Sequence, residues 1–151
     1  MLPTLSFHPV IQDDRHTVAR HRYPDLDETH PALANYANWL ADALAQDVYR
    51  GWLYKQEGEA VAGIGLILLN WGPSKNDPSP IRARVVNVFT APEARRRGLA
   101  RSLLTHALDE AHHLGIRTVS LGTSEMAHDL YEEFGFQFYP SEMLRSSSKV
   151  E

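Results

Sequence analysis

The sequence predicts an α/β fold, of the α+β type, built around a mixed β-sheet. In the second half of the chain, β-branched segments alternate with segments of helical apolar spacing, which is typical of strand–helix–strand units with parallel pairing. In the first half, strand-like residues 48–55 and 59–71 are separated by the turn sequence QEGE, which indicates an antiparallel hairpin. With 151 residues, of which 43% are hydrophobic, the chain can bury one core, and we place a single domain at 1–151.

The segment before the hairpin predicts one short strand and two helices. LSFHPV, residues 5–10, has the composition of a strand. Asp13 or Asp14 can cap a first helix that extends to about Tyr23. Thr29 can cap a second helix over 30–46, in which apolar residues recur at helical spacing: Leu33, Tyr36, Ala37, Leu40 and Leu44.

After the hairpin, Gly, Pro and Ser mark residues 72–80 as a loop, and residues 82–90 form the next predicted strand. The helix that starts near Leu99 has a continuous apolar face and ends at Gly115. A β-branched strand is predicted at 116–124, a short helix from Ala127 to the stop at Gly135, and a last strand at 136–145.

Composition excludes several classes of protein. The chain has no cysteine, so it can hold neither a disulfide nor a thiolate metal site, and its histidines lack metal-ligand spacing. Its longest apolar stretch, residues 60–71, is too short to span a bilayer, and the N-terminus lacks the pattern of a signal peptide. A net charge of −4 disfavours binding to nucleic acid or anionic membrane. We therefore expect a cytoplasmic protein with no metal, no nucleic-acid partner and no membrane partner.

Against this acidic background, one turn is strongly basic. Arg95, Arg96, Arg97 and Arg101 surround Gly98 where the strand at 82–90 passes into the long helix. A helix N-terminus presents free N–H groups and a positive dipole end, and a glycine lets an anion approach the main chain. The spacing fits neither GxGxxG nor the GK[ST] loop, so the turn predicts an anion site of another kind, best suited to a pyrophosphate. A solvated basic turn is the alternative.

The sequences NVFTAPEARRRGLARSLL, at 87–104, and AHDLYEEFGF, at 127–136, resemble the GCN5-related N-acetyltransferase (GNAT) superfamily. The order of elements agrees over most of the chain, and the specific motifs cover 84–136. The resemblance implies a mostly antiparallel sheet with one parallel strand pair splayed at an acyl-CoA site, flanked by about four helices. It implies acetyl-CoA as co-substrate and an amine as acceptor.

The family's R/Q-x-x-G-x-G/A motif falls on Arg95, Gly98 and Ala100. By resemblance, N–H groups from Arg96 to Arg101, a segment that includes Arg97 and Leu99, would bind the coenzyme pyrophosphate. The pantetheine arm would lie along Val88, Phe89 and Thr90 as an added strand, and an N–H near Phe89 or Thr90 would face the thioester oxygen. The family's last helix often begins with an asparagine where this chain has Ser124, which can still donate one hydrogen bond.

Tyr131 is the candidate general acid and also a candidate contact of the thiol. A phenol with a pKa near 10 stays protonated at neutral pH and can protonate the departing thiolate. Alternatively, Tyr131 is a packed aromatic residue at helical spacing with Leu130 and Phe134. No carboxylate stands in the strand 82–90, so the general base stays open between a water chain and Glu125, His128 or Glu142.

The amine acceptor is not identified by the sequence, but its site is expected at the first two helices and the loop 70–82. The acidic turn with Asp25, Asp27 and Glu28 could attract a cationic amine, or it is an ordinary solvated loop. The leading hypothesis is an N-acyltransferase that transfers acetyl from acetyl-CoA to a primary amine. Its rivals are an acyl-CoA-binding module without turnover and, less in keeping with the net charge, a nucleic-acid contact. Dimers are common in the resembling family, which by analogy alone suggests a homodimer.

Overall fold

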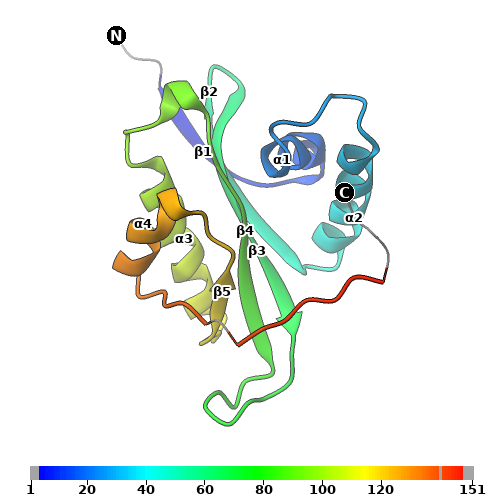
Figure 1. Cartoon of the computed structure of the whole chain (residues 1–151). Helices are drawn as coiled ribbons and strands as arrows, with labels where there is room; N and C mark the ends of the chain where they lie inside the picture. The colour runs from blue at the N-terminus through cyan, green and yellow to red at the C-terminus, as the bar shows by residue number, and fades with distance from the viewer. Residues whose placement is uncertain (1–3, 140, 148–151) are drawn as a thin grey trace.

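The computed structural model describes residues 4–139 and 141–147, and its centre is a 5-stranded sheet (Figure 1). The strands are β1 (Leu5–Pro9), β2 (Tyr49–Gln56), β3 (Glu59–Asn70), β4 (Ile81–Thr90) and β5 (Val119–Leu121). They lie side by side in chain order. Every neighbouring pair from β1 to β4 is antiparallel, whereas β4 and β5 are parallel. This confirms the predicted mixed, mostly antiparallel sheet with one parallel pair.

Helices cover both faces of this sheet. Within the described residues, the α-helices are α1 (Arg15–Arg22), α2 (Pro31–Ala45), α3 (Leu99–His113) and α4 (His128–Glu133), with short 3-10 turns before α1, α3 and α4. Figure 1 shows α1 and α2 on one side of the sheet and α3 and α4 on the other. The flanking helices were therefore predicted correctly. No helix in the described part of the chain has the length and apolarity needed to cross a membrane.

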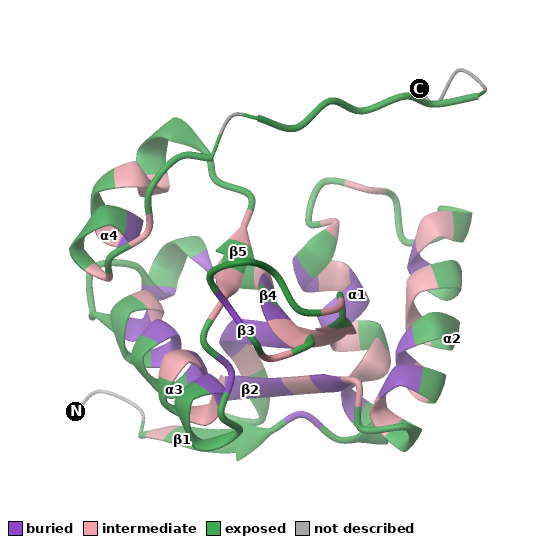
Figure 2. Ribbon diagram, turned by 90° about the horizontal axis from the view of Figure 1, so that it is seen from below, coloured by how far each residue is buried: buried purple, intermediate pink, exposed green. Residues whose placement is uncertain are grey.

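Two apolar clusters, one on each face, hold the helices to the sheet. The amphipathic α3 buries Leu103, Leu104 and Ala107 against sheet residues such as Leu66 and Val85. On the other face, Val18 of α1 and Leu40 of α2 pack in one cluster with residues of β2 and of the segment before α1: Val10, Tyr49 and Leu53. Figure 2 shows the buried faces of α2 and α3 turned towards the sheet. The periodic burial explains why both helices form where apolar spacing predicted them.

The predicted cap of α2 is wrong by one residue. His30, not Thr29, is the N-cap, because its Nδ1 accepts a hydrogen bond of 3.1 Å from the N–H of Ala32. Thr29 instead donates through its N–H and its hydroxyl to the Asp27 carboxylate. Asp14 stands at the N-cap position of α1 without a side-chain cap bond, since its carboxylate accepts from the N–H of Ile11 and from Lys55.

The last predicted strand, 136–145, is also wrong for the residues that are described. Residues 136–139 and 141–147 form no strand, and the side chains of Tyr139, Met143 and Leu144 are exposed. Two features of the sequence and fold account for this. The neighbouring strand β5 pairs over three residues only, and Pro140 within the segment carries no N–H for a ladder. Figure 2 shows the segment extended along the outside of the molecule.

Candidate functional site

The parallel strands β4 and β5 separate partway along their length. They pair at Ala83↔Val119, Arg84↔Ser120 and Val85↔Leu121. As far as the described residues show, β4 then continues to Thr90 with a partner strand on its β3 side only. The edge of β4 that faces β5 therefore carries unpaired main-chain groups beyond Val85. Such an edge can hydrogen-bond an extended ligand as an added strand. Val88, Phe89 and Thr90, the predicted pantetheine contacts, lie on this segment.

A β-bulge lies at the point where the strands separate. Gly65 pairs with Val86 and Gly63 with Phe89, so two β4 residues, Asn87 and Val88, stand opposite Ile64. Asn87 has a φ of 56°, in the left-handed region that asparagine tolerates better than most residues. The bulge turns the Asn87 side chain towards α1 and α2, while Val88 is exposed.

The basic turn after β4 has the geometry of an anion site. Gly98 is the N-cap of α3 with a φ of 73°, and a Cβ placed on it would meet no atom within 4 Å. The first main-chain bond of the helix runs from the N–H of Ser102 to the carbonyl of Gly98, at 3.0 Å. Consequently, the N–H groups from Arg96 to Arg101 have no hydrogen-bond acceptor within the described residues.

These N–H groups open onto a hollow of about 260 Å³. It is lined by Thr90, Ala94, Arg95, Arg96, Gly98, Leu99, Ala100, Arg101 and Leu130. The hollow thus joins the end of β4 to the first turn of α3 and to α4. The structure brings the predicted residues of the arginine motif together with Thr90 around one open space.

The four arginines are not equivalent. Arg97 donates to Oε1 of Gln56 at 2.8 Å, and Arg101 forms an ion pair with Glu133 of α4. Arg95 and Arg96 have no ion-pair partner among the described residues, and both are exposed. The guanidinium groups that are free to meet an incoming anion are therefore those of Arg95 and Arg96.

Tyr131 lies in the core cluster on the α3 side of the sheet. Its ring is buried at 7% exposure and meets the Phe136 ring edge-on, with centroids 5.9 Å apart. Burial raises the pKa of Tyr131 above its ordinary value near 10. The hydroxyl has no hydrogen-bond partner among the described residues. Ser124 is exposed and begins the 3-10 turn before α4.

The candidate carboxylates are engaged in other contacts or exposed to solvent. Glu28 of the acidic turn pairs with His16 and Arg20, and the Asp27 carboxylate accepts from Thr29, which lowers the pKa of Asp27. Glu125 and Glu142 are exposed, and His128 meets the ring of Phe138. In the described residues, no group of three or more His, Cys, Asp or Glu side chains is arranged to hold a metal ion.

A polar cluster that the sequence did not predict lies beneath α1 and α2. Asn87 donates through Nδ2 to the hydroxyls of Tyr36, at 2.9 Å, and Tyr49, at 3.1 Å, and accepts from Nη1 of Arg22 at 3.1 Å. The signal in the sequence was a lone asparagine within a β-branched run. Tyr36 gave no signal, because it fits the apolar spacing of its helix.

His21 was missed as well. It is 8% exposed and stacks on the Phe89 ring with centroids 4.1 Å apart and planes at 13°. Burial lowers the pKa of His21 from 6.5 to about 4, against a smaller opposing effect of a hydrogen bond at Ala60. At neutral pH the ring is therefore uncharged, and it fixes the side chain of Phe89 on the splayed strand.

A sheet with two parallel strands splayed beside a glycine-capped anion site defines the fold class of the GCN5-related acetyltransferases. Solved structures agree. A GCN5-related N-acetyltransferase from Ralstonia eutropha JMP134 superposes with a TM-score of 0.84 at 28% identity, covering 96% of this chain and 100% of the other. A predicted acetyltransferase from Clostridium acetobutylicum, solved with acetyl-CoA, shares the fold at a TM-score of 0.87 and 16% identity, covering 95% and 96% of the two chains.

The chain belongs to the Acetyltransferase (GNAT) family, whose sequence model matches residues 12–136. A protein of Bacillus subtilis (strain 168), described as the uncharacterized N-acetyltransferase YsnE, is 30% identical over 87 residues. That match covers 54% of this chain and 52% of the Bacillus protein, so it spans about half the length of each.

Proposed function

We propose that this protein transfers the acetyl group of acetyl-CoA to the amino group of an acceptor molecule. One observation carries the proposal: among the described residues, the run of unbonded N–H groups from Arg96 to Arg101 follows a strand whose β5-facing edge is unpaired beyond Val85. A pyrophosphate and an extended pantetheine arm are the two chemical groups that such a pair of features suits. Family membership and the CoA-containing relatives support the same coenzyme.

In the proposed reaction, the neutral amine nitrogen attacks the thioester carbonyl. A C–N bond forms, the C–S bond breaks, and the electron pair of that bond leaves on sulfur. An N–H of β4 near Phe89 or Thr90 stabilises the oxyanion, and the amine proton passes to solvent water. Tyr131 gives its proton to the CoA thiolate and is reprotonated by solvent water, because a phenol is protonated at neutral pH and can act as the donor.

The alternative is an acyl-CoA-binding module without turnover. It is favoured by the strand β4, which has no carboxylate that could deprotonate an ammonium group. The two candidates share the coenzyme site and differ in amine-dependent release of thiol.

Thermal denaturation with acetyl-CoA, free CoA and ATP tests the coenzyme site. A ligand at one hundred times its Kd stabilises by about 2.7 kcal/mol, which should raise the Tm by roughly 5–10 °C for a chain of this size. We expect that shift with acetyl-CoA and with CoA but not with ATP. If neither acetyl-CoA nor CoA raises the Tm, both acetyl transfer and acyl-CoA binding are excluded.

Gly98→Glu should abolish the shift, because the new carboxylate fills the open space at the α3 N-terminus and repels phosphate. Gly115→Glu is the matched control. Gly115 lies just beyond the other end of α3 with a φ of 75°, and a Cβ there would also meet nothing within 4 Å. The control imposes the same backbone strain and should keep the coenzyme shift. Equal loss in both variants would mean that strain, not the anion site, was being measured.

A further inference from the structure

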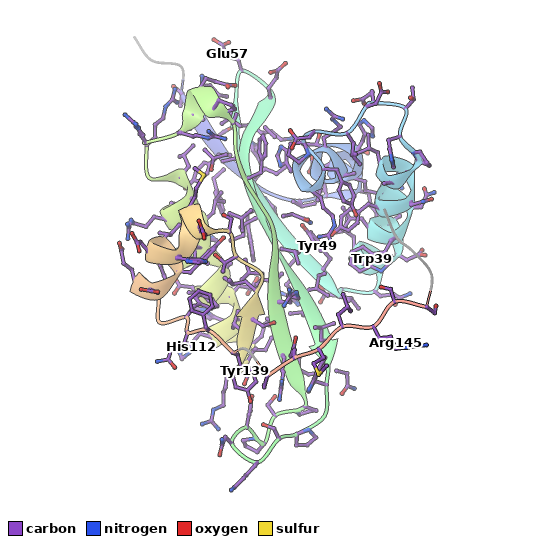
Figure 3. All side chains as sticks on the ribbon, viewed as in Figure 1. Trp39, Tyr49, Glu57, His112, Tyr139 and Arg145 are labelled. Carbon is purple, nitrogen blue, oxygen red and sulfur yellow. The ribbon has the colours of Figure 1, made fainter. Side chains whose placement is uncertain are left out.

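A polar cluster lies on the acceptor side of the splayed strands. Its members come from α1, α2, β2 and the β4 bulge: Arg22, Tyr23, Tyr36, Tyr49 and Asn87. Asn87 stands two residues past Val85, the last β4 residue that pairs with β5. Any acceptor that approaches the thioester from the α1–α2 side passes this cluster. Figure 3 labels Tyr49 and Trp39, both on that side of the sheet.

The hydrogen bonds within this cluster leave N–H and O–H groups that can donate to a ligand. Arg22 can only donate, so it fixes the Asn87 amide with Oδ1 towards the guanidinium and Nδ2 towards the phenols. The two Nδ2 protons go to the oxygens of Tyr36 and Tyr49, which thereby act as acceptors and keep their own protons. Burial raises the pKa of both phenols, so both remain proton donors at neutral pH.

Among the described residues, Arg22 is a fixed cation without a counterion. Its guanidinium carbon lies 4.7 Å from the Tyr36 ring centroid and 5.6 Å from that of Tyr23, which holds it in place by cation–π contact. Among the described residues no carboxylate lies within ion-pair distance of it. None of the carboxylates of the nearby acidic turn forms an ion pair with Arg22: Glu28 pairs with His16 and Arg20, and Asp27 accepts from Thr29. The cluster therefore repels a cationic group and suits a carboxylate.

An aromatic hollow of about 270 Å³ adjoins the cluster. It is lined by Tyr23, Ala32, Asn35, Tyr36 and Trp39. Tyr36 belongs to both sites, since its ring lines the hollow and its hydroxyl bonds Asn87. Trp39 is 41% exposed and packs against Tyr36, with centroids 5.4 Å apart. A flat apolar side chain that leaves water for this hollow gains both burial and aromatic contact.

We propose that the acceptor is an amino acid with a large apolar or aromatic side chain, bound by its carboxylate to Arg22 and by its side chain in the Tyr23–Tyr36–Trp39 hollow. This inference rests on the proposed acetyl transfer and narrows its acceptor. The carboxylate holds the amine at a fixed distance from Asn87, near the vertex of the splayed strands. Polyamines and other polycations are the acceptors that the site selects against.

The test compares L-phenylalanine with phenylethylamine and L-phenylalaninamide, which lack the negative charge, by release of CoA thiol. For the unaltered protein we expect kcat/KM to be about ten- to a hundred-fold higher with phenylalanine, the range of one charge-assisted hydrogen-bonded contact. Arg22→Gln should remove that preference, mainly by raising KM for phenylalanine. It should leave the thermal shift with acetyl-CoA unchanged.

Arg15→Gln is the control, because Arg15 begins the same helix and, within the described part of the chain, its side chain bonds only the Gln12 carbonyl. It should retain the preference for phenylalanine. Equal rates with all three amines would overturn carboxylate recognition while leaving acetyl transfer intact. If none of the amines reacts, binding of N-acetyl-L-phenylalanine is compared with that of N-acetylphenylethylamine in the presence of CoA. Equal binding of the two, or binding of neither, would overturn the inference, whereas loss of the acetyl-CoA shift itself would overturn the proposed function.

Discussion

At the scale of single residues, Tyr131 combines a buried aromatic ring with a hydroxyl that can transfer a proton. The ring packs with Phe136 in the core, which accounts for its helical spacing, and the hydroxyl has no partner in the described residues. Packing and proton transfer are therefore separable in this side chain, because phenylalanine preserves the first and removes the second.

Tyr131→Phe should lower kcat by about a hundred-fold, since general acid catalysis commonly contributes that much or more. The acetyl-CoA thermal shift should persist. Because burial raises the Tyr131 pKa above 10, this acid stays protonated as the pH rises, and kcat should show no falling limb from Tyr131 between pH 6 and 9. Tyr139→Phe, on an exposed residue, is the control. An unchanged kcat in Tyr131→Phe would contradict general acid catalysis by Tyr131 and leave packing as its role.

His21 should make stability fall in acid. Its folded pKa of about 4 lies below the unfolded value of 6.5, so between these two values the unfolded chain binds a proton that the folded chain does not. Above pH 6.5, His21 does not change the free energy of unfolding. As the pH falls from 6.5 to about 4, the preference of the folded state for the uncharged ring lowers that free energy progressively. The loss amounts to about 3 kcal/mol at 1.36 kcal/mol per pKa unit.

Urea unfolding at pH 7 and pH 4 measures this effect as a difference between variants. Relative to His21→Gln, the unaltered protein should lose about 3 kcal/mol more of its free energy of unfolding on acidification. His112→Gln, on the exposed side of α3, should behave like the unaltered protein. An equal pH dependence in all three proteins would show that His21 is not buried as an uncharged ring.

At the scale of elements, strand β3 is shaped around a tyrosine from β2. A Cβ placed on Gly65 would lie 2.0 Å from the Tyr49 hydroxyl and 2.4 Å from Cζ, so only glycine leaves room for this phenol. The space lets Tyr49 reach across β3 to Asn87 at the β4 bulge. The glycine at position 65 thus allows Tyr49 to hold Asn87 on the proposed acceptor side of the site.

Gly65→Ala should destabilise the protein by about 1–3 kcal/mol, the usual cost of overpacking a core, because Tyr49 must leave its position. Chemical denaturation measures the loss. Gly122→Ala is the matched control, since a Cβ there would meet only the end of the Arg84 side chain, at an ordinary 3.5 Å. Equal stability of the two variants would mean that Tyr49 does not fill the space beside Gly65.

Elements governed by local pattern could be predicted from the sequence, and those governed by distant contacts could not. The helices over α2 and α3 follow apolar spacing, and the basic turn is a contiguous stretch whose chemistry is local. The last strand was wrong because a strand exists only with a partner, and periodicity does not report whether one is available. The Arg22–Asn87 contact joins residues 65 positions apart, a distance at which sequence pattern carries no information.

At the scale of the whole molecule, the described C-terminal segment contributes little to the core. Met143 and Leu144 are 100% and 94% exposed. The double variant M143S/L144S should therefore leave the Tm unchanged at both low and high protein concentration. A lowered Tm that depends on concentration would indicate that these apolar side chains are buried between two copies of the chain, as the homodimer suggested by analogy would allow.

The order of the strands has a consequence for a chain that leaves the ribosome. Because the sheet runs β1 to β5 in the order of synthesis, each antiparallel neighbour already exists when the next strand emerges. The parallel neighbours β4 and β5 differ from the antiparallel pairs because the crossover helix α3 is made between them. We therefore expect the nascent chain to complete the surface beneath α1 and α2 first. The short parallel pairing between β4 and β5 forms after it, once α3 has been made.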